Sequence, residues 1–406
     1  MKTLRPFWDF TAGSVAVVSR GNRYYYAWIA LLVLLSLGGL AAWGNQAANG
    51  LITSNMRDQV SWGFYIGNFA FLVGVAAAAV VLVIPAYVYQ WGPLKEVVML
   101  AELVSLAAII MCIFFVTVDL GRPQLFWHLM PALGNPNFPY SLLVWDILVL
   151  TSYWAISYFI VTYLLFKDYM GQKYNVNFIM PVIFLSIPLA ISIHTVTAFL
   201  FMGLKARPFW DTAILAPRFL SSAFSSGPAL VLIVLQIMRR VGSISIPNKA
   251  LFKIAEFLAY AMAINLFFLG VEVFSEFYSP TQHAVHARLH WFGLDGRTDI
   301  AIYTWLSLAC NVIAFVIFAV RPLRYKLPLL SAGCVLAFGG VFIEKGLGLL
   351  LPGMTPDMLG EIYIYNPSLN ELAVGVGVWS AGALFFTLMA KVAMAISAGE
   401  LRHRGT

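Results

Sequence analysis

The chain has 406 residues, of which 61% are hydrophobic and 11% are charged, and its formal net charge is +7. Soluble globular domains carry about 25% charged residues, so this composition excludes an ordinary soluble enzyme, a disordered chain and a nucleic-acid-binding protein. The three cysteines lie inside apolar runs and lack the paired spacing of an iron–sulfur or zinc site. The composition therefore predicts an integral membrane protein whose partners include membrane lipid and no nucleic acid.

Ten apolar runs are long enough to cross a bilayer, which takes roughly 20 residues per helix. The predicted spans are 27–44, 60–90, 97–118, 142–166, 178–202, 214–238, 250–278, 300–320, 327–351 and 372–397. Since these runs are too long and too uniformly apolar for barrel strands, we expect an all-α fold with about ten transmembrane helices.

Lysine and arginine are distributed unequally between the two sides of these spans. The termini and the loops on their side are short and basic, whereas the opposite loops are long, close to neutral, and rich in aromatic residues, proline and glycine. The positive-inside rule therefore places both termini in the cytoplasm, and we expect the cell inner membrane. The long outer loops suit either a docking surface and site entrance or simple covers over helix ends.

Ionisable side chains inside a bilayer are costly and usually face the bundle interior. Six acids and two of the lysines within the predicted spans are of interest here: Glu102, Asp146, Glu256, Glu272, Glu276, Glu344, Lys345 and Lys391. Five of them lie toward the outer helix ends, at the same level as Asp119, Arg122, His128 and Arg218. Side chains from six different helices are therefore expected to meet at one depth.

The carboxyl groups suggest a proton route. Glu272 and Glu276 share one helix face, one turn apart, and close carboxylates suit proton storage, although Glu276 could instead reach the headgroups. Glu344 and Lys345 point in different directions, and either salt bridging or proton transfer fits them. Glu102 and Glu256 lie near the inner surface.

His194 is the single histidine well inside a span, within the polar stretch Ser192-Ile-His-Thr-Val-Thr197. A neutral imidazole there could bond a quinone carbonyl and pass a proton, or it could bond a neighbouring helix. Transmembrane b-type haem needs paired axial ligands, usually histidines. We therefore expect neither haem nor an iron–sulfur cluster in this chain, so that electrons must pass through a partner.

His283, His286 and His290 lie in one outer loop with spacings of three and four residues. Such spacing could ligate a metal on a helix, but no supporting ligands are evident nearby, so a partner-contact loop is favoured and no metal site is predicted.

The segment Asp119-Leu-Gly-Arg-Pro123 closes the third predicted helix and precedes His128 and Trp145-Asp146. This pattern resembles the NrfD/polysulfide reductase membrane subunit family. Segments that begin at Arg57, His194 and Ala206 narrow the resemblance to subunits of the DsrP and HmcC types, and the likeness covers about residues 20–400.

The resemblance implies two four-helix bundles flanked by peripheral first and last helices. The implied divisions are a cytoplasmic segment (1–26), a first helix and outer loop (27–59), a quinone-site bundle (60–202), a second bundle (203–351), and an outer loop with the last helix and tail (352–406). It also implies menaquinone, or another quinone, as bound substrate, and a periplasmic ferredoxin-like iron–sulfur subunit of the DsrO type. Further implied subunits include cytochromes and a cytoplasmic iron–sulfur protein (DsrM, DsrJ and DsrK types). The function implied is electron transport in dissimilatory sulfur metabolism.

Two sets of candidate residues follow, and neither set is itself catalytic. Tyr65 and Asn68 share a face of the second helix with Trp62, which fits an aromatic belt better. The quinone-binding candidates are Tyr65, Asn68, Asp119, Arg122, His128, Asp146 and His194. The proton-pathway candidates are Glu102, Glu256, Glu272, Glu276, Glu344 and Lys345.

A proton-coupled transporter without a redox role is the alternative. Its buried acids would fit, but transporters typically show internal repeats and helices broken at the midplane. The sequence shows neither clearly, so the redox subunit is the favoured hypothesis.

Overall fold

The computed structural model describes residues 5–130, 132–241, 246–278, 284–357 and 359–403. Within these ranges the chain is helical, apart from loops and an isolated bridge between Leu294 and Arg297. Among the described residues, ten helical segments are long and apolar enough to cross a membrane, and each coincides with a predicted span. The prediction of an all-α, ten-span membrane protein is confirmed.

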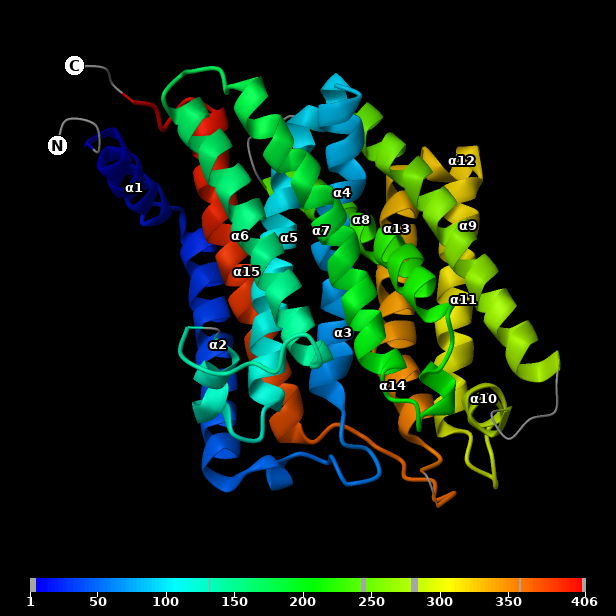
Figure 1. The fold of residues 1–406 in the computed structure, drawn as a ribbon. Helices are drawn as coiled ribbons and strands as arrows, with labels where there is room; N and C mark the ends of the chain where they lie inside the picture. Colours follow the sequence, from blue (N-terminus) through cyan, green and yellow to red (C-terminus); the bar gives the residue numbers. More distant parts are fainter. Residues whose placement is uncertain (1–4, 131, 242–245, 279–283, 358, 404–406) are drawn as a thin grey trace.

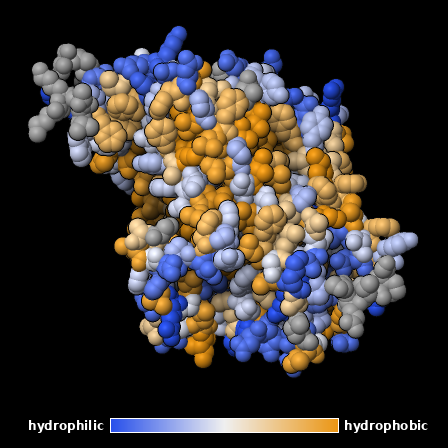
Figure 2. All heavy atoms as spheres, in the orientation of Figure 1, coloured by the Kyte–Doolittle hydropathy of each residue, from blue (hydrophilic) through white to orange (hydrophobic). Residues whose placement is uncertain are grey.

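Both chain ends lie at the same end of the helical array, here called the terminal face (Figure 1). The opposite end is called the loop face, and it carries three short helical turns and α10 (Figure 1). These elements are η1 (Leu51–Thr53), η3 (Pro123–Leu129), η4 (Pro208–Trp210) and α10 (Ala284–Trp291). Hydrophobic side chains gather across the middle of the face seen in Figure 2, with hydrophilic ones toward both ends, as expected of a bilayer-spanning protein.

The N-terminal segment forms a helix, α1 (Arg5–Val18), which the hydropathy pattern did not predict. Its buried residue Phe10 packs edge-on against Phe166 and Tyr169, at ring-centroid distances of 5.7 and 5.3 Å. This contact ties α1 to the terminal-face end of α6.

The first group of spans holds a helix that is interrupted within the membrane. It runs through α3 (Phe64–Ala76), α4 (Ala78–Val83) and the π-helical turn η2 (Ile84–Val88). At the first interruption the Ala76 carbonyl accepts from the hydroxyl groups of Ser105 and Tyr153. Side chains that take over a backbone carbonyl in this way break the helical ladder. The remaining helices of the group are α5 (Gly92–Asp119), α6 (Leu142–Tyr169) and α7 (Val176–Met202).

The second group consists of α8, α9, α11 and the pair α13–α14. Their bounds are α8 (Leu215–Val241), α9 (Asn248–Tyr278), α11 (Asp299–Ala319), α12 (Arg321–Arg324), α13 (Leu327–Lys345) and α14 (Leu347–Met354). The pair is interrupted at Gly346, which lies against the backbone of Gly67 on α3. A Cβ atom at Gly346 would lie 2.6 Å from the Phe342 carbonyl oxygen, so the interruption requires glycine.

The first and last spans, α2 (Arg23–Asn49) and α15 (Leu369–Ser397), pack against each other along one side of the array (Figure 1). Their backbones are in close contact: a Cβ atom on Gly39 would lie 2.4 Å from the Gly377 Cα. The α15 helix also packs against α5, so the pair covers the first group of spans.

Candidate functional site

The predicted site residues are distributed over several buried clusters, most of them toward the loop face. Three of these clusters are described in turn. The Glu371 cluster comprises Gln46, Tyr65, Asn68, Asp119, Tyr365, Glu371 and Trp379. The Asp146 pair comprises Asp146 and Thr197, with His194 one turn away. The Arg218 cluster comprises Arg218, Asn265, Glu272, Asn311 and Glu344.

Tyr65 and Asn68 face the peripheral helices. The fully buried Tyr65 hydroxyl donates to Gln46 Oε1 on α2 at 2.7 Å, and Gln46 Nε2 donates to the Val118 carbonyl at 2.6 Å. Asn68 Nδ2 donates to the Phe64 carbonyl, while its Oδ1 accepts from Trp379 Nε1 on α15, both at 2.8 Å. Hydrogen bonds thus connect these two predicted quinone-binding residues to α2 and α15.

Glu371 is the fully buried centre of this cluster and was not predicted as a site residue. Its carboxylate accepts from the Tyr365 hydroxyl and from the backbone amides of Asn55 and Ser368, the latter two at 3.0 and 2.8 Å. Burial, followed by the negative charge of Glu371, raises the pKa of Tyr365. The sequence signal was the capping box Ser368-x-x-Glu371, but the tenth span was predicted to begin at 372 and the acid was counted as a loop charge.

Asp119 lies at the end of α5, within electrostatic range of Glu371 and Tyr65. Its Oδ1 is buried and accepts no hydrogen bond within the part of the chain that the structure describes. Arg122, just before η3, and His128, on η3, are exposed, and the His128 ring stacks on Trp127 at 3.8 Å. No ion pair joins Asp119 to Arg122 in the described ranges.

Asp146 and His194 lie at the contact between α6 and α7. The buried Asp146 accepts from the Thr197 hydroxyl at 2.6 Å. His194 Nδ1 lies 3.0 Å from the Ala190 carbonyl, which assigns the ring proton to Nδ1. The buried Nε2 then carries a lone pair and makes no hydrogen bond of standard geometry among the described residues, although the Gly74 carbonyl lies near the ring.

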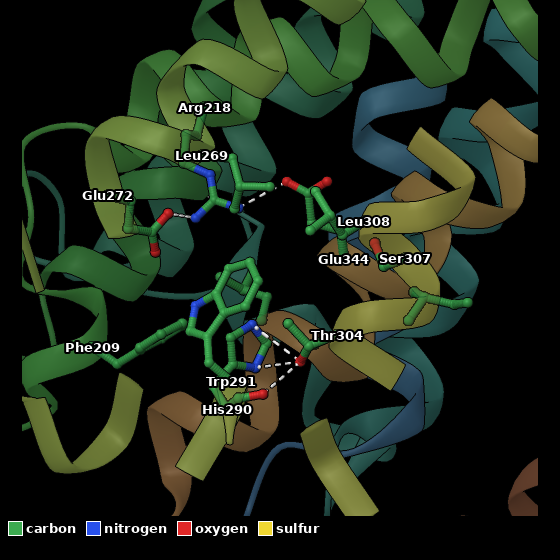
Figure 3. A pocket seen from close by; sticks show the side chains of 13 residues that line it. Phe209, Arg218, Leu269, Glu272, His290, Trp291, Thr304, Ser307, Leu308 and Glu344 are labelled. Atoms are coloured by element: carbon green, nitrogen blue, oxygen red, sulfur yellow. Dashed lines mark hydrogen bonds and ion pairs between the residues drawn. The ribbon is translucent and has the colours of Figure 1, made fainter. Parts of the chain in front are cut away.

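Arg218 of α8 joins two carboxylates from neighbouring helices (Figure 3). Its guanidinium pairs with Glu272 of α9 and, through Nη2, with Glu344 Oε1 of α13 at 2.8 Å. Glu344 Oε2 also accepts from Asn311 Nδ2 at 2.9 Å and from Asn265 Nδ2 at 3.4 Å. These contacts bring the sixth, seventh and ninth spans together at one depth, as expected. Arg218 itself was noted at that depth but was not assigned to the site.

Lys345 lies between the Asp146 pair and the Arg218 cluster. Its Nζ donates to the Phe219 carbonyl at 2.6 Å and lies 4.1 Å from the centroid of the Phe219 ring. The ammonium group is buried and lies within electrostatic range of Glu344, Arg218 and His194. Lys345 therefore connects the two groups of spans electrostatically.

A cavity of about 30 Å³ adjoins the Arg218 cluster (Figure 3). Its ionisable and hydroxyl lining consists of Arg218, Glu272, Glu344, His290, Thr304 and Ser307. One water needs about 10–15 Å³ of such space, so roughly two waters fit. Pockets for organic ligands measure about 300–1,000 Å³. The cavity suits proton transfer through water and is too small for a quinone ring.

A second, open groove of about 410 Å³ lies on the loop face, between α2 and α3. It is lined by residues 51, 52, 56–59 and 61, which include the predicted motif at Arg57. The groove lies near the Glu371 cluster, because the amide of Asn55, next to Met56 in the groove wall, donates to Glu371. Its volume falls in the range of pockets for organic ligands.

Three proton-pathway candidates lie apart from the Arg218 cluster or at its edge. Glu102 is buried on α5, and its Oε2 has no partner among the described residues. Glu256 is partly exposed on α9 and pairs with Lys253 at 3.2 Å. Glu276 is half-buried one turn beyond Glu272.

His286 and His290 of the histidine motif contact different residues. His286 Nδ1 lies 2.9 Å from the Pro352 carbonyl, whereas His290 Nδ1 lies 3.1 Å from the Thr304 hydroxyl. His283 lies outside the described residues. Within the described ranges, no group of three or more histidine, cysteine, aspartate or glutamate residues is placed to hold a metal ion.

Ten membrane-spanning helices with buried, mostly hydrogen-bonded polar clusters define a polytopic membrane protein rather than a soluble enzyme. The family comparison defines it further: residues 53–355 match the model of the polysulphide reductase NrfD family. The match covers well over half of the chain, which therefore belongs to this family.

Curated relatives cover nearly the whole chain. A Halobacterium salinarum protein named as a membrane subunit of dimethyl sulfoxide reductase is 25% identical, with 93% of each chain covered. The Hdr-like menaquinol oxidoreductase integral membrane subunit of Archaeoglobus fulgidus is 23% identical, over 91% of this chain and 93% of its own. A selenate reductase subunit of Mesobacillus selenatarsenatis is 20% identical, over 88% and 91%.

Proposed function

We propose that this chain is the quinone-interacting membrane subunit of a respiratory reductase complex. It exchanges electrons between menaquinone or menaquinol and an iron–sulfur partner on the loop face. Membership of the NrfD family and the names of the relatives support this proposal, because one relative is a menaquinol oxidoreductase subunit. The observation that carries it is the loop-face groove near a buried cluster in which Asp119 keeps an unpartnered carboxylate oxygen.

The remaining hydrogen-bonding capacity of this cluster suits a quinone headgroup. Asn68 uses one of its two Nδ2 hydrogens on the Phe64 carbonyl, which leaves the other for a quinone carbonyl. Asp119 Oδ1 is available to accept the hydroxyl proton of a quinol. Tyr65, whose hydroxyl donates to Gln46, keeps acceptor capacity and orients the ring.

The other quinone candidates take different roles in this proposal. Asp146 and His194 lie deeper and receive protons from the headgroup, and His194 Nε2 is an available acceptor. Arg122 and His128 are exposed at the start of η3 and within it, so they act at the mouth of the site.

Quinol oxidation releases two electrons and two protons, whereas an iron–sulfur protein accepts electrons singly. We place a ferredoxin-like partner of the DsrO type on the loop face, which the loop charges predict to be periplasmic, with both termini in the cytoplasm. The association with DsrM-, DsrK- and DsrJ-like subunits and with dissimilatory sulfur metabolism rests on the resemblance of the sequence motifs.

A proton route through the second group of spans completes the proposal. Lys345 lies between His194 and the Arg218 cluster, so protons from the quinone site pass toward Glu272 and its neighbour Glu276. Glu344, with three side-chain donors, provides a fixed negative charge. Glu102 and Glu256 serve as inlets closer to the terminal face.

The test is menaquinol oxidation by the native complex in lipid nanodiscs, with an artificial electron acceptor. Asp119→Asn removes the proton acceptor, and a general base contributes about 10²–10⁴-fold, so turnover should fall at least about 100-fold. The matched control is Asp211→Asn, at an exposed residue paired with Lys205 on the same face. It should retain wild-type turnover.

Wild-type turnover by Asp119→Asn would contradict the assignment of the quinone site. A chain that purifies without redox partners and moves protons with a solute would instead support the transporter alternative.

A further inference from the structure

We propose that His290 forms the loop-face end of the proton route, passing protons between the water-sized cavity at Glu272 and the aqueous phase. This inference rests on the proposed function, and it assigns a role to a histidine motif that quinone chemistry leaves unused.

The short helix α10 holds His290 at the loop-face end of the second group of spans (Figure 1). Trp305 Nε1 of α11 donates to the Trp291 carbonyl at 2.9 Å, and the His290 ring packs edge-on against Phe209 at 5.6 Å. The buried residues Ala287 and Leu289 anchor the same helix. His290 is thus held rigidly between the cavity and the loop face.

Hydrogen bonding leaves one nitrogen of the ring available for exchange. The Thr304 hydroxyl lies 2.8 Å from the carbonyl oxygen of His290, 3.1 Å from its Nδ1 and 3.5 Å from its Nε2, so Nδ1 is the nearer ring nitrogen (Figure 3). A hydroxyl that donates to the carbonyl accepts from Nδ1–H, so Nε2 keeps its lone pair. Burial, and then the positive charge of Arg218, lower the pKa of His290 to about 3. The imidazole is therefore neutral at pH 7 and relays protons rather than storing them.

The two carboxylates of the cavity differ in their partners. Glu344 accepts from Arg218, Asn265 and Asn311, whereas Glu272 is paired with Arg218 alone in the contacts that the structure describes. A carboxylate with fewer donors loses less on protonation. Glu272 is therefore the exchangeable group, and roughly two waters in the cavity would connect it to His290.

The transfer conserves charge. A proton leaves the Glu272 carboxyl through water and enters one ring nitrogen of His290, and the proton on the other nitrogen leaves toward the loop face. Arg218 faces His290 from α8, and Glu272 and Glu344 face it from α9 and α13. The guanidinium opposes a lasting imidazolium and so favours onward release.

The test uses the native complex in liposomes that contain a pH dye, with menaquinol and an electron acceptor. His290→Gln is expected to reduce the protons delivered per quinol at least fivefold, while quinol oxidation with a protonophore stays within twofold of wild type. Thr304→Val should give a smaller reduction with the same sign. His286→Gln, on the same helix but bonded to the Pro352 carbonyl, is the matched control and should deliver wild-type numbers of protons.

Equal proton delivery by wild type and both cavity variants would overturn the role of His290 and leave the quinone function intact. A wild-type complex that does not oxidise menaquinol would contradict the proposed function itself, and the inference with it. If the complex that carries His290→Gln does not assemble, the number of protons delivered by the Thr304→Val complex decides the result.

Discussion

The first and second groups of spans satisfy their buried polar side chains in different ways. In the second group, Arg218 joins two carboxylates from separate helices, and Asn265 and Asn311 donate to one of them, although Asn311 Oδ1 finds no partner among the described residues. In the first group, Asp146 has a neutral hydroxyl partner, and Asp119 and His194 each keep a buried atom without one among the described residues. Opposite charges lock helices together and fix positions for protons, whereas sites with spare hydrogen-bonding capacity can accept a ligand. The proposed proton-handling residues therefore lie in the more fully paired region, and the proposed quinone site lies in the region with spare hydrogen-bonding capacity.

The largest effect is expected from Arg218→Met, which leaves two buried carboxylates without their cation. Removing one partner of a buried ion pair typically costs about 3–5 kcal/mol of unfolding free energy. Unfolding in detergent measures it, and Lys205→Met is the control, because its pair with Asp211 is exposed and contributes at most about 1 kcal/mol. Equal losses in the two variants would contradict the claim that the Arg218 cluster locks the helices.

Glu371→Ala tests whether the Glu371 cluster is as rigid as the second group. It removes the acceptor of two backbone amides and the Tyr365 hydroxyl, so we expect a loss of about 2–3 kcal/mol. Glu361→Ala, at an exposed acid with one long contact to Gln59, should change the unfolding free energy little. A loss as large as that of Arg218→Met would remove the contrast between the two regions.

Thr197→Val should have a smaller effect, because it removes one hydroxyl donor to Asp146 and keeps the volume of the side chain. A hydrogen bond of this kind contributes about 1–2 kcal/mol. Thr195→Val is the matched control, since its hydroxyl bonds only Ile191 within the same helix. Thermal unfolding of both variants measures the difference, and identical midpoints would show that Asp146 does not depend on Thr197.

The smallest effect on the unfolding free energy at neutral pH is expected from His290→Gln. In acid the same substitution should have a distinct effect. The pKa of His290 is about 3 in the folded protein and about 6.5 in an unfolded chain, so the folded state binds fewer protons between these values. The unfolding free energy should therefore fall as the pH drops from about 6.5 toward 3. His290→Gln should show a shallower decrease over the same window, and parallel curves would mean that His290 is not held neutral.

Much of the fold was predictable because bilayer thickness and hydropathy act locally along the chain. Ten apolar runs became ten membrane-spanning helices, with ends that moved by a few residues, as where 27–44 became Arg23–Asn49. The helical N-terminal segment and the interruption at Ala77 were not predicted, because the first is too short for a span and the second depends on hydroxyl groups of α5 and α6.

Depth was also predictable, since residue number along a helix sets the distance from the membrane surface. The predicted depth correctly grouped Glu272 with Glu344, but it could not show that Arg218 joins them or that Arg122 remains exposed just before η3. Those outcomes depend on which helix faces meet, and this chain has many helices of similar apolar character. Glu371 was missed for a related reason, because its burial follows from the packing of α15 over α3 and α5.

The amino-acid sequence by itself thus determined the number of spans, the depth of the ionisable groups and the family. The tertiary structure alone decided which of these groups touch: Asp119 near Glu371, Asp146 with Thr197, and Arg218 between two glutamates. The physical reason is that crossing a bilayer depends on local apolar length, whereas pairing depends on the rotation and lateral packing of helices far apart in the chain.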